Sequence, residues 1–188
     1  MIRGALVVAL LGLASVVLAL ALVGFFVYAK LYRIPSPAME PTIKCEAPTR
    51  GCTGNADDHV LALRLRWPFS GLARGDIVVF RAPAVARRRC GAGGVYVKRV
   101  VGLPGERVAE RRGVVLVDGG RLDEPYVKPG HRDRGSYAPH RVPDGAYFVL
   151  GDNRAHSCDS RIWGMLPRRD VLAKVVATYW PPTRITVR

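Results

Sequence analysis

Lys98 is the residue whose type and surroundings most clearly permit chemistry. It lies in the apolar run VYVKRVV at residues 95–101, which is typical of a β-strand, so that Lys98 and Arg99 point to opposite faces. An apolar setting disfavours the ammonium form and can lower a lysine pKa by several units from about 10.4. A neutral lysine amine can act as a general base, which an arginine cannot do. The alternative is a solvated lysine on an edge strand.

Four ordered segments give this lysine a context. They are SPAMEPT at 36–42, RGDIVVF at 74–80, YVKRVVGLPGE at 96–106 and GDNR at 151–154, the last followed by Ser157, Asp159, Ser160, Arg161 and Gly164. In sequence and order they resemble the boxes of type I signal peptidases, the Ser/Lys endopeptidases that remove signal peptides from secretory preproteins. The resemblance covers most of residues 1–166, and four ordered matches argue against chance. It implies an enzyme that needs no metal and no cofactor.

Position 38 departs from the family pattern. Where the family has Ser-x-Ser-Met-x-Pro-Thr, this chain has Ala38 at the place of the nucleophilic serine. A methyl group has no proton to give to Lys98 and no oxygen to attack a carbonyl, so the chain as written is expected to be inactive. Ser36 is a poor substitute, because two residues of extended chain displace it by about 6.6 Å. Two accounts stay open. A deliberate Ser-to-Ala change is favoured by the intact boxes, and the alternative is a natural, non-catalytic pseudopeptidase that binds signal peptides.

The resemblance also implies roles for three residues around this position. Lys98 would be the general base that takes the nucleophile's proton and later activates water. Ser36 would contribute its hydroxyl to the oxyanion hole, together with the backbone N–H of residue 38, and one such donor is typically worth about 3 kcal/mol to the transition state. Ser157 would hydrogen-bond and orient the lysine amine. Taken without the resemblance, both serines would be ordinary loop residues.

Charged residues near the third box are assigned structural roles. By resemblance, Asp159 and Arg161 form an ion pair that stiffens this loop. Asp152 lies in a GDN turn, where Asp and Asn side chains commonly cap backbone groups. We prefer that role to a carboxylate catalyst or to a metal ligand acting with His156, and we expect no metal site.

The resemblance implies that the substrates are signal peptides of secretory preproteins with small residues one and three positions before the cut. Small side chains require shallow apolar pockets. The positions assigned to the walls of these pockets are Ile34, Pro35, Met39, Ile43 and Val97. Packing in the hydrophobic core is the alternative role for these side chains.

The four cysteines fit no zinc template with two-residue spacers, and their even number suits an oxidising compartment. Six residues separate Cys45 from Cys52, which could close a small disulfide loop. Cys158 lies inside the third box and Cys90 lies eight positions before Lys98. A bridge between them would tie the strand of the base to the loop that orients it. We therefore hypothesise the pairs Cys45–Cys52 and Cys90–Cys158.

Short strands separated by turns must position these residues. Period-two patterns predict strands at 60–66, 76–80, 95–101, 114–120 and 147–153. Turn signals at 104–105 and 118–120 make neighbouring strands antiparallel. We expect a mainly β fold, with antiparallel sheets like those of a signal peptidase. The proline-rich segment 34–43 is interpreted as a loop or edge strand, and 44–59 as a surface excursion.

The N-terminal segment predicts a membrane anchor. Residues 4–29 carry no charge, and as a helix they would be about 39 Å long, enough for a hydrocarbon core of about 30 Å. The alternative is a cleavable signal peptide, whose apolar region would be only about 7–15 residues. The chain is thus divided into a transmembrane anchor at 1–30 and a peptidase domain at 31–188. Flanking charges do not orient the anchor. The resemblance implies a single-pass protein of the cell membrane with an extracytoplasmic domain.

The formal net charge of +14 favours anionic partners, either nucleic acid or a lipid bilayer. The anchor favours the bilayer. The basic stretch 81–94 has no interleaved aromatic residues, so we interpret it as a solvated loop and expect no nucleic-acid partner. A membrane-tethered nucleic-acid-binding module is the rival function, and it predicts an affinity that falls steeply with salt.

Overall fold

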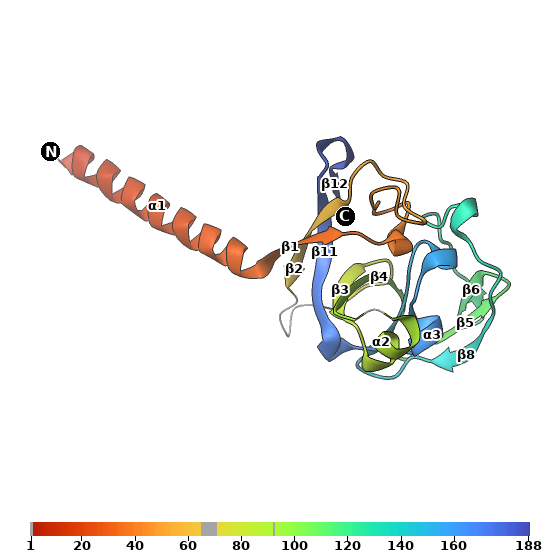
Figure 1. The fold of residues 1–188 in the computed structure, drawn as a ribbon. Helices are drawn as coiled ribbons and strands as arrows, with labels where there is room; N and C mark the ends of the chain where they lie inside the picture. The colour runs from red at the N-terminus through yellow and green to blue at the C-terminus, as the bar shows by residue number, and fades with distance from the viewer. Residues whose placement is uncertain (1, 65–70, 92) are drawn as a thin grey trace.

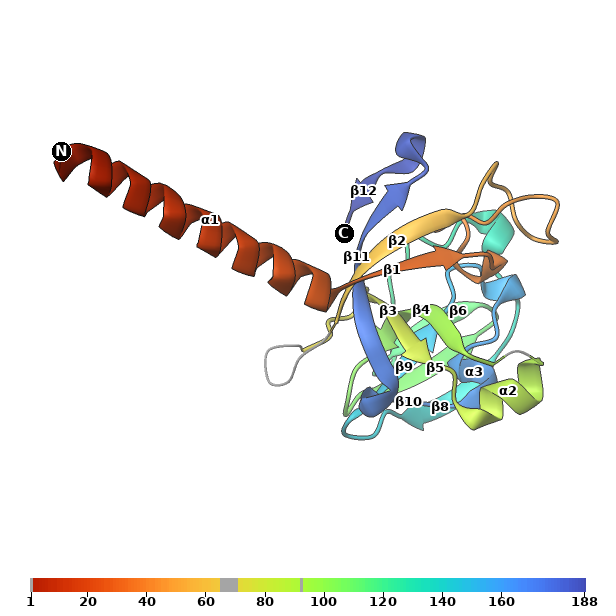
Figure 2. The ribbon, with the colours of Figure 1, turned by 60° about the vertical axis from the view of Figure 1, so that its left-hand side comes forward.

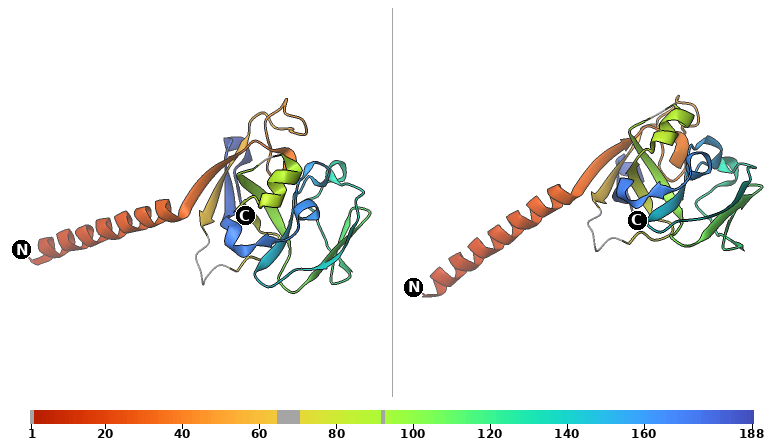
Figure 3. Two further views of the ribbon diagram at one scale, coloured as in Figure 1. Left: turned by 60° about the horizontal axis from the view of Figure 1, so that its bottom comes forward. Right: turned by 90° about the horizontal axis from the view of Figure 1, so that it is seen from below.

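A long N-terminal helix leads into a body made of two antiparallel sheets (Figure 1). This computed structural model describes residues 2–64, 71–91 and 93–188. Helix α1, Ile2–Tyr28, projects away from the sheets, and the turned views of Figure 2 and Figure 3 agree. Its apolar side chains, such as Leu13 and Leu20, are exposed. Among the described residues, no helix has both the length and the apolar character needed to cross a bilayer.

The larger sheet has eight strands in the order β1-β2-β11-β3-β4-β9-β10, with β12 pairing with β11. They are β1 (Ala29–Ile34), β2 (Asp58–Arg64), β3 (Ile77–Arg81), β4 (Val95–Gly102), β9 (Ala146–Leu150), β10 (Leu166–Pro167), β11 (Val171–Trp180) and β12 (Thr186–Val187). Strand β4 lies between β3 and β9, and its register with β3 sets Lys98 opposite Val78. Lys98 is therefore inside the sheet, and the edge-strand alternative is wrong.

The smaller sheet has the order β7-β6-β5-β8. Its strands are β5 (Arg107–Arg111), β6 (Val114–Val117), β7 (Gly120–Arg121) and β8 (Tyr137–Arg141). Between β6 and β7, Asp118 and Gly119 both have positive φ, 48° and 83°, as a two-residue type I′ hairpin turn requires. Val101 and Phe148 of the larger sheet pack with Val108 of the smaller one in a shared buried cluster. This cluster joins the two sheets.

The expected mainly β, antiparallel fold is confirmed, and the predicted strands correspond to β2, β3, β4, the β6–β7 hairpin and β9. The last two residues of the strand predicted at 60–66 lie outside the described part of the chain. The sequence patterns do not predict β11, although it pairs with both β2 and β3. They also assign no strand to β1, which follows directly after α1.

The interpretation of residues 81–94 as a loop is wrong in part, because helix α2 (Ala84–Cys90) occupies the middle of this segment. Alanine and arginine are good helix formers, and Arg87, Arg88 and Arg89 stand in the last turn, where positive charge complements the helix dipole. Gly91, at φ 70°, ends the helix. The other short helices are η1 (Pro37–Met39), η2 (Pro129–His131), η3 (Arg154–His156), α3 (Ser160–Trp163), η4 (Arg168–Asp170) and η5 (Pro182–Arg184).

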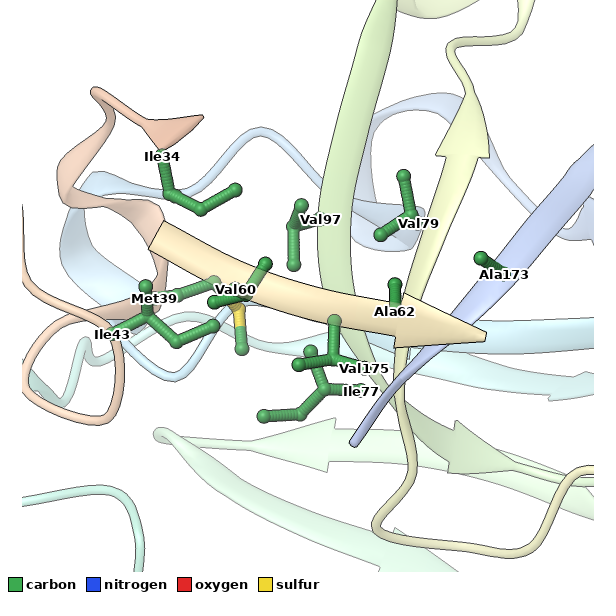
Figure 4. Close-up of a cluster of buried hydrophobic side chains, with 10 residues drawn as sticks. All are labelled: Ile34, Met39, Ile43, Val60, Ala62, Ile77, Val79, Val97, Ala173 and Val175. Carbon is green, nitrogen blue, oxygen red and sulfur yellow. The ribbon is translucent and has the colours of Figure 1, made fainter. Parts of the chain in front are cut away.

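A hydrophobic cluster fastens the segment after β1 to the larger sheet. Figure 4 shows Ile34, Met39 and Ile43 gathered near Val60 of β2, and the cluster continues through Ala62 into β3, β4 and β11. Met39 and Ile43 are almost completely buried. The chain that carries position 38 is therefore held by the core on both sides, by Ile34 before it and by Met39 and Ile43 after it.

Candidate active site

A cavity of about 360 Å³ opens where the segment after β1, strand β4 and the loop after β9 meet. Its lining consists of Arg33, Ile34, Pro35, Ser36, Ala38, Met39, Cys90, Gly93, Val95, Tyr96, Val97, Lys98, His156 and Cys158. Ala38 and Lys98 both belong to this lining. The position expected for the nucleophile and the residue expected for the base thus face one space.

Ala38 lies in the short helix η1, whose N-cap is Ser36. The backbone N–H of Ala38 donates to Ser36 Oγ over a long 3.4 Å, so the two groups expected to form an oxyanion hole are neighbours. The carbonyl of Ala38 accepts from the backbone N–H of Asn153 at 3.1 Å. That hydrogen bond holds position 38 against the loop after β9.

Lys98 is buried, with only 5% of its surface exposed. Its amine donates to the carbonyl of Val97 at 3.0 Å and lies 5.3 Å from the centre of the Tyr96 ring. Burial lowers the pKa of Lys98 to about 8, although the charges of Asp159 and Asp152 act in the opposite direction. The amine therefore loses its proton near pH 8 and not above pH 10, which makes the neutral form that a general base requires accessible.

Ser157 is brought close to position 38 by the absence of a side chain at Gly151. A Cβ added at Gly151 would clash with both Ser157 Oγ and the carbonyl oxygen of Ala38. The hydroxyl of Ser157 is buried and has no hydrogen-bond partner within the described residues. The structure thus shows no hydrogen bond from Ser157 to Lys98, and the orienting role stays a prediction.

Asp159 and Arg161 form an ion pair with Nη2 and Oδ2 2.8 Å apart. The same carboxylate accepts from the backbone N–H of Gly151 at 3.1 Å, and it is fully buried. Arg161 also contacts Asp133 at 2.5 Å and donates to the carbonyl of Arg154 at 2.9 Å. The guanidinium of Arg161 therefore connects the loop after β9, through Arg154, to the segment that contains Asp133.

Asp152 behaves differently from the expected backbone cap. Its carboxylate pairs with the guanidinium of Arg99 at 2.6 and 2.8 Å. Arg99 follows Lys98 in β4 and points to the other face of the sheet, as strand alternation predicts. This ion pair connects β4 to the loop that carries Ser157.

Four of the five proposed wall residues line the cavity, namely Ile34, Pro35, Met39 and Val97. Ile43 does not. It has no exposed surface and lies inside the core cluster, so its assignment to the substrate pockets is wrong and the core-packing alternative holds. Tyr96 and His156 line the cavity and were missed as site residues. Alternation along β4 could have found Tyr96, since it shares a face with Lys98.

The structure contains the disulfides Cys45–Cys52 and Cys90–Cys158, the two pairs that were hypothesised. Cys90 and Cys158 line the cavity, so their bridge joins the end of α2 to the loop of Ser157. The Cys45–Cys52 loop is held by Glu40, a buried carboxylate that accepts from the N–H groups of Cys45 and Thr53. This role of Glu40 was not predicted, because its hydrogen-bond partners Cys45 and Thr53 are 5 and 13 residues away in the sequence.

Several known proteins are similar to this chain. Residues 6–180 match the family described as signal peptidase, peptidase S26. A signal peptidase I from Leptolyngbya laminosa is 34% identical over 174 residues, covering 91% of this chain and 77% of that protein. A signal peptidase I from Bacillus caldolyticus is 33% identical over 168 residues, covering 83% and 81%. A crystal structure of a signal peptidase I from Enterococcus faecalis is 31% identical, with a TM-score of 0.44 and 54% of this chain covered.

Proposed function

Because the chain belongs to the signal peptidase family, peptidase S26, we propose that its cavity is built to cleave signal peptides from secretory preproteins with a serine–lysine dyad. In this proposal Lys98 is the general base and position 38 belongs to the nucleophile. One observation carries the proposal. The buried amine of Lys98, with its pKa lowered to about 8, lines the same cavity as Ala38.

A serine at position 38 would transfer its proton to the neutral amine of Lys98 while its Oγ attacks the scissile carbonyl. The resulting ammonium would protonate the leaving amine, the C–N bond would break, and an ester to the serine would form. Lys98, neutral again, would then take a proton from water as the water oxygen attacks the ester carbonyl, and its ammonium would return that proton to the serine Oγ as the C–Oγ bond breaks. Each proton removed by Lys98 is returned, so the lysine is regenerated.

The oxyanion would be held by two donors, the backbone N–H of residue 38 and the hydroxyl of Ser36. Their mutual contact of 3.4 Å is long, which means that an incoming oxyanion has to displace only a weak hydrogen bond. Loss of one such donor typically costs about 3 kcal/mol of transition-state stabilisation. Ser157 is proposed to hold the lysine amine once substrate has entered, and this would use its otherwise unpaired hydroxyl.

With Ala38 in place, neither acylation nor deacylation can occur, so the proposed state of this chain is a peptide-binding form without turnover. Substrate choice is proposed to depend on the walls formed by Ile34, Pro35, Met39 and Val97. These walls would accept small residues at the first and third positions before the cut. The alternative function is a natural pseudopeptidase that binds signal peptides, and Ala38 is the observation in its favour.

The single-pass topology is proposed on separate grounds. Residues 4–29 carry no charge, and apolar side chains such as Leu10, Leu11 and Leu13 are exposed along α1. A helix that is apolar on all sides needs apolar surroundings. We assign residues 1–30 to the anchor and 31–188 to an extracytoplasmic domain, which also suits the two disulfides.

The test restores the nucleophile. Ala38→Ser in the full chain is expected to cleave a synthetic preprotein after a small residue, and the double variant Ala38→Ser/Lys98→Met is expected to be inactive. Ala38→Ser/Lys128→Met, which removes an exposed lysine, is the matched control and should cleave normally. A folded Ala38→Ser chain that binds the signal peptide without cutting it would instead support the pseudopeptidase.

A further inference from the structure

A second cavity, of about 580 Å³, lies where α1 joins the sheets, and it shares no lining residue with the candidate active site. Three basic residues line it, Lys30, Arg64 and Arg81. Two tyrosines, Tyr28 and Tyr32, and apolar residues of α1 and β11 complete the lining. Its volume lies within the range of about 300–1,000 Å³ that is typical of ligand pockets.

The three basic residues occupy positions where strand alternation would continue the hydrophobic core. Lys30 is paired with Ala62, and Arg64 is the next residue on the same face of β2. Arg81 stands two residues beyond Val79 in β3, again on the face of a core residue. The core-facing side of the sheet thus ends in three positive charges beside α1.

No described acidic side chain forms a salt bridge with any of these three residues. All three are exposed at the mouth of the cavity. The carbonyl end of α1 carries a partial charge of only about −0.5, so it offsets a small part of the positive charge. The cavity therefore carries an excess of positive charge that attracts anions.

We propose that this cavity binds the phosphate of an anionic phospholipid headgroup. The inference rests on the proposed anchoring of α1 in the membrane, which would set the cavity at the level of the headgroups. Val27 and Leu172 give it an apolar side on which the start of an acyl chain can lie. Tyr28 and Tyr32 suit the interface, where aromatic residues with one polar end are enriched. Basic pockets beside membrane helices are known to hold such headgroups.

The experiment uses the full chain in a neutral detergent and soluble short-chain lipids. Dihexanoylphosphatidylglycerol is expected to bind at least about tenfold more tightly than dihexanoylphosphatidylcholine or inorganic phosphate. Equal affinity for the two lipids would overturn the proposal. Phosphate that binds as tightly as the anionic lipid would overturn it as well, because it would indicate an anion site without lipid recognition.

A variant pair assigns the binding to the cavity. Lys30→Gln/Arg64→Gln/Arg81→Gln is expected to weaken phosphatidylglycerol binding at least about tenfold, with an unchanged melting temperature. The control Arg107→Gln/Arg111→Gln/Arg121→Gln removes the same charge from exposed positions of the smaller sheet, and it should stay within about twofold of the parent chain. Equal loss in both variants would overturn the assignment, since it would indicate only attraction by net charge.

A photoactivatable phosphatidylglycerol in nanodiscs tests the parent chain without any substitution. The label is expected on the peptides around residues 28–32 and 171–172, and a label confined to other segments would overturn the proposal. Binding of a signal peptide is measured on the same sample. If the chain does not bind the signal peptide but still prefers phosphatidylglycerol, only the proposed peptidase function is refuted. If it binds the signal peptide but shows no lipid preference, only the lipid site is refuted.

Discussion

Two carboxylates stand near Lys98 and raise its pKa, yet burial has the larger effect. Each carboxylate already has an arginine partner, since Asp159 pairs with Arg161 and Asp152 with Arg99. An arginine stays protonated at every physiological pH, so its positive charge offsets part of the effect of each carboxylate on the lysine amine. This arrangement lets the site use Asp159 and Asp152 to fix the loop while Lys98 still loses its proton near pH 8.

The pH dependence of the restored enzyme follows from this pKa. Only the neutral amine of Lys98 accepts a proton, and the neutral fraction grows as pH rises through about 8. For the Ala38→Ser chain we expect kcat/KM to rise about tenfold between pH 7 and pH 9 and to level off above that. Initial rates on a peptide substrate without titratable groups check this. A flat profile over that range would contradict the role of Lys98 as the base.

Several site residues could be predicted from the sequence because neighbours along the chain determine them. Alternation in the run 95–101 is sufficient to separate Lys98 from Arg99. Ile43 was placed wrongly, since residues 39 and 43 are equally apolar in sequence and only the packing decides which one faces the cavity. The pairing of Asp152 with Arg99 was missed, because 53 positions separate the two residues. Such partners are fixed by sheet pairing and not by a local pattern.

The loop after β9 depends on Gly151 for its close approach to η1. The substitution Gly151→Ala would drive a methyl group into Ser157 Oγ and the carbonyl of Ala38, so the loop or η1 must shift. A displacement of about 1 Å can cost on the order of a hundredfold in rate, and we expect that loss in the Ala38→Ser background. Gly130→Ala, where a Cβ meets open space, is the control and should retain full activity. Equal rates for the two variants would contradict this account of the loop.

The two disulfides should differ in their contribution to stability. Cys90 and Cys158 are 68 residues apart in sequence and Cys45 and Cys52 only 7. In the chain-entropy model these separations correspond to about 4 and about 2 kcal/mol. Cys90→Ala/Cys158→Ala is thus expected to lower the free energy of unfolding more than Cys45→Ala/Cys52→Ala, as measured by denaturant unfolding of the full chain. The reverse order would show that strain or local packing outweighs chain entropy.

Elements with a strong local pattern were predicted, and elements defined by long-range contacts were not. The apolar run at 95–101 predicted β4, and the Asp-Gly-Gly turn predicted the β6–β7 hairpin. Strand β11 is the longest strand described, but it was not predicted. Its pairing with β2 contains two register shifts, so its buried residues do not alternate regularly along the sequence. Helix α2 is short and basic, so its sequence alone resembles a solvated loop. Its packing and the bond from Cys90 to Cys158 stabilise it.

At the scale of the whole molecule, positive charge and the proposed anchor act on the same partner. Lys30, Arg64 and Arg81 surround the cavity next to α1, and the candidate active site is a separate cavity with its own lining residues. A chain held by α1 and by headgroups would keep its peptide cavity close to the bilayer surface. That position suits a substrate which is itself a membrane-inserted signal peptide.

The anchor can be tested by placing charge in the middle of α1. Val16→Arg/Val17→Arg is expected to cost about 6 kcal/mol of insertion free energy, because each central arginine costs about 2.5–3.5 kcal/mol. After flotation of vesicles through a density gradient, the parent chain should rise with the lipid and this variant should stay in the dense fractions. Ile185→Arg/Val187→Arg adds the same charge at exposed positions near the C-terminus and should float like the parent. If the α1 variant floats equally well, the helix is not the membrane anchor, and the cavity lined by Lys30, Arg64 and Arg81 must account for any binding.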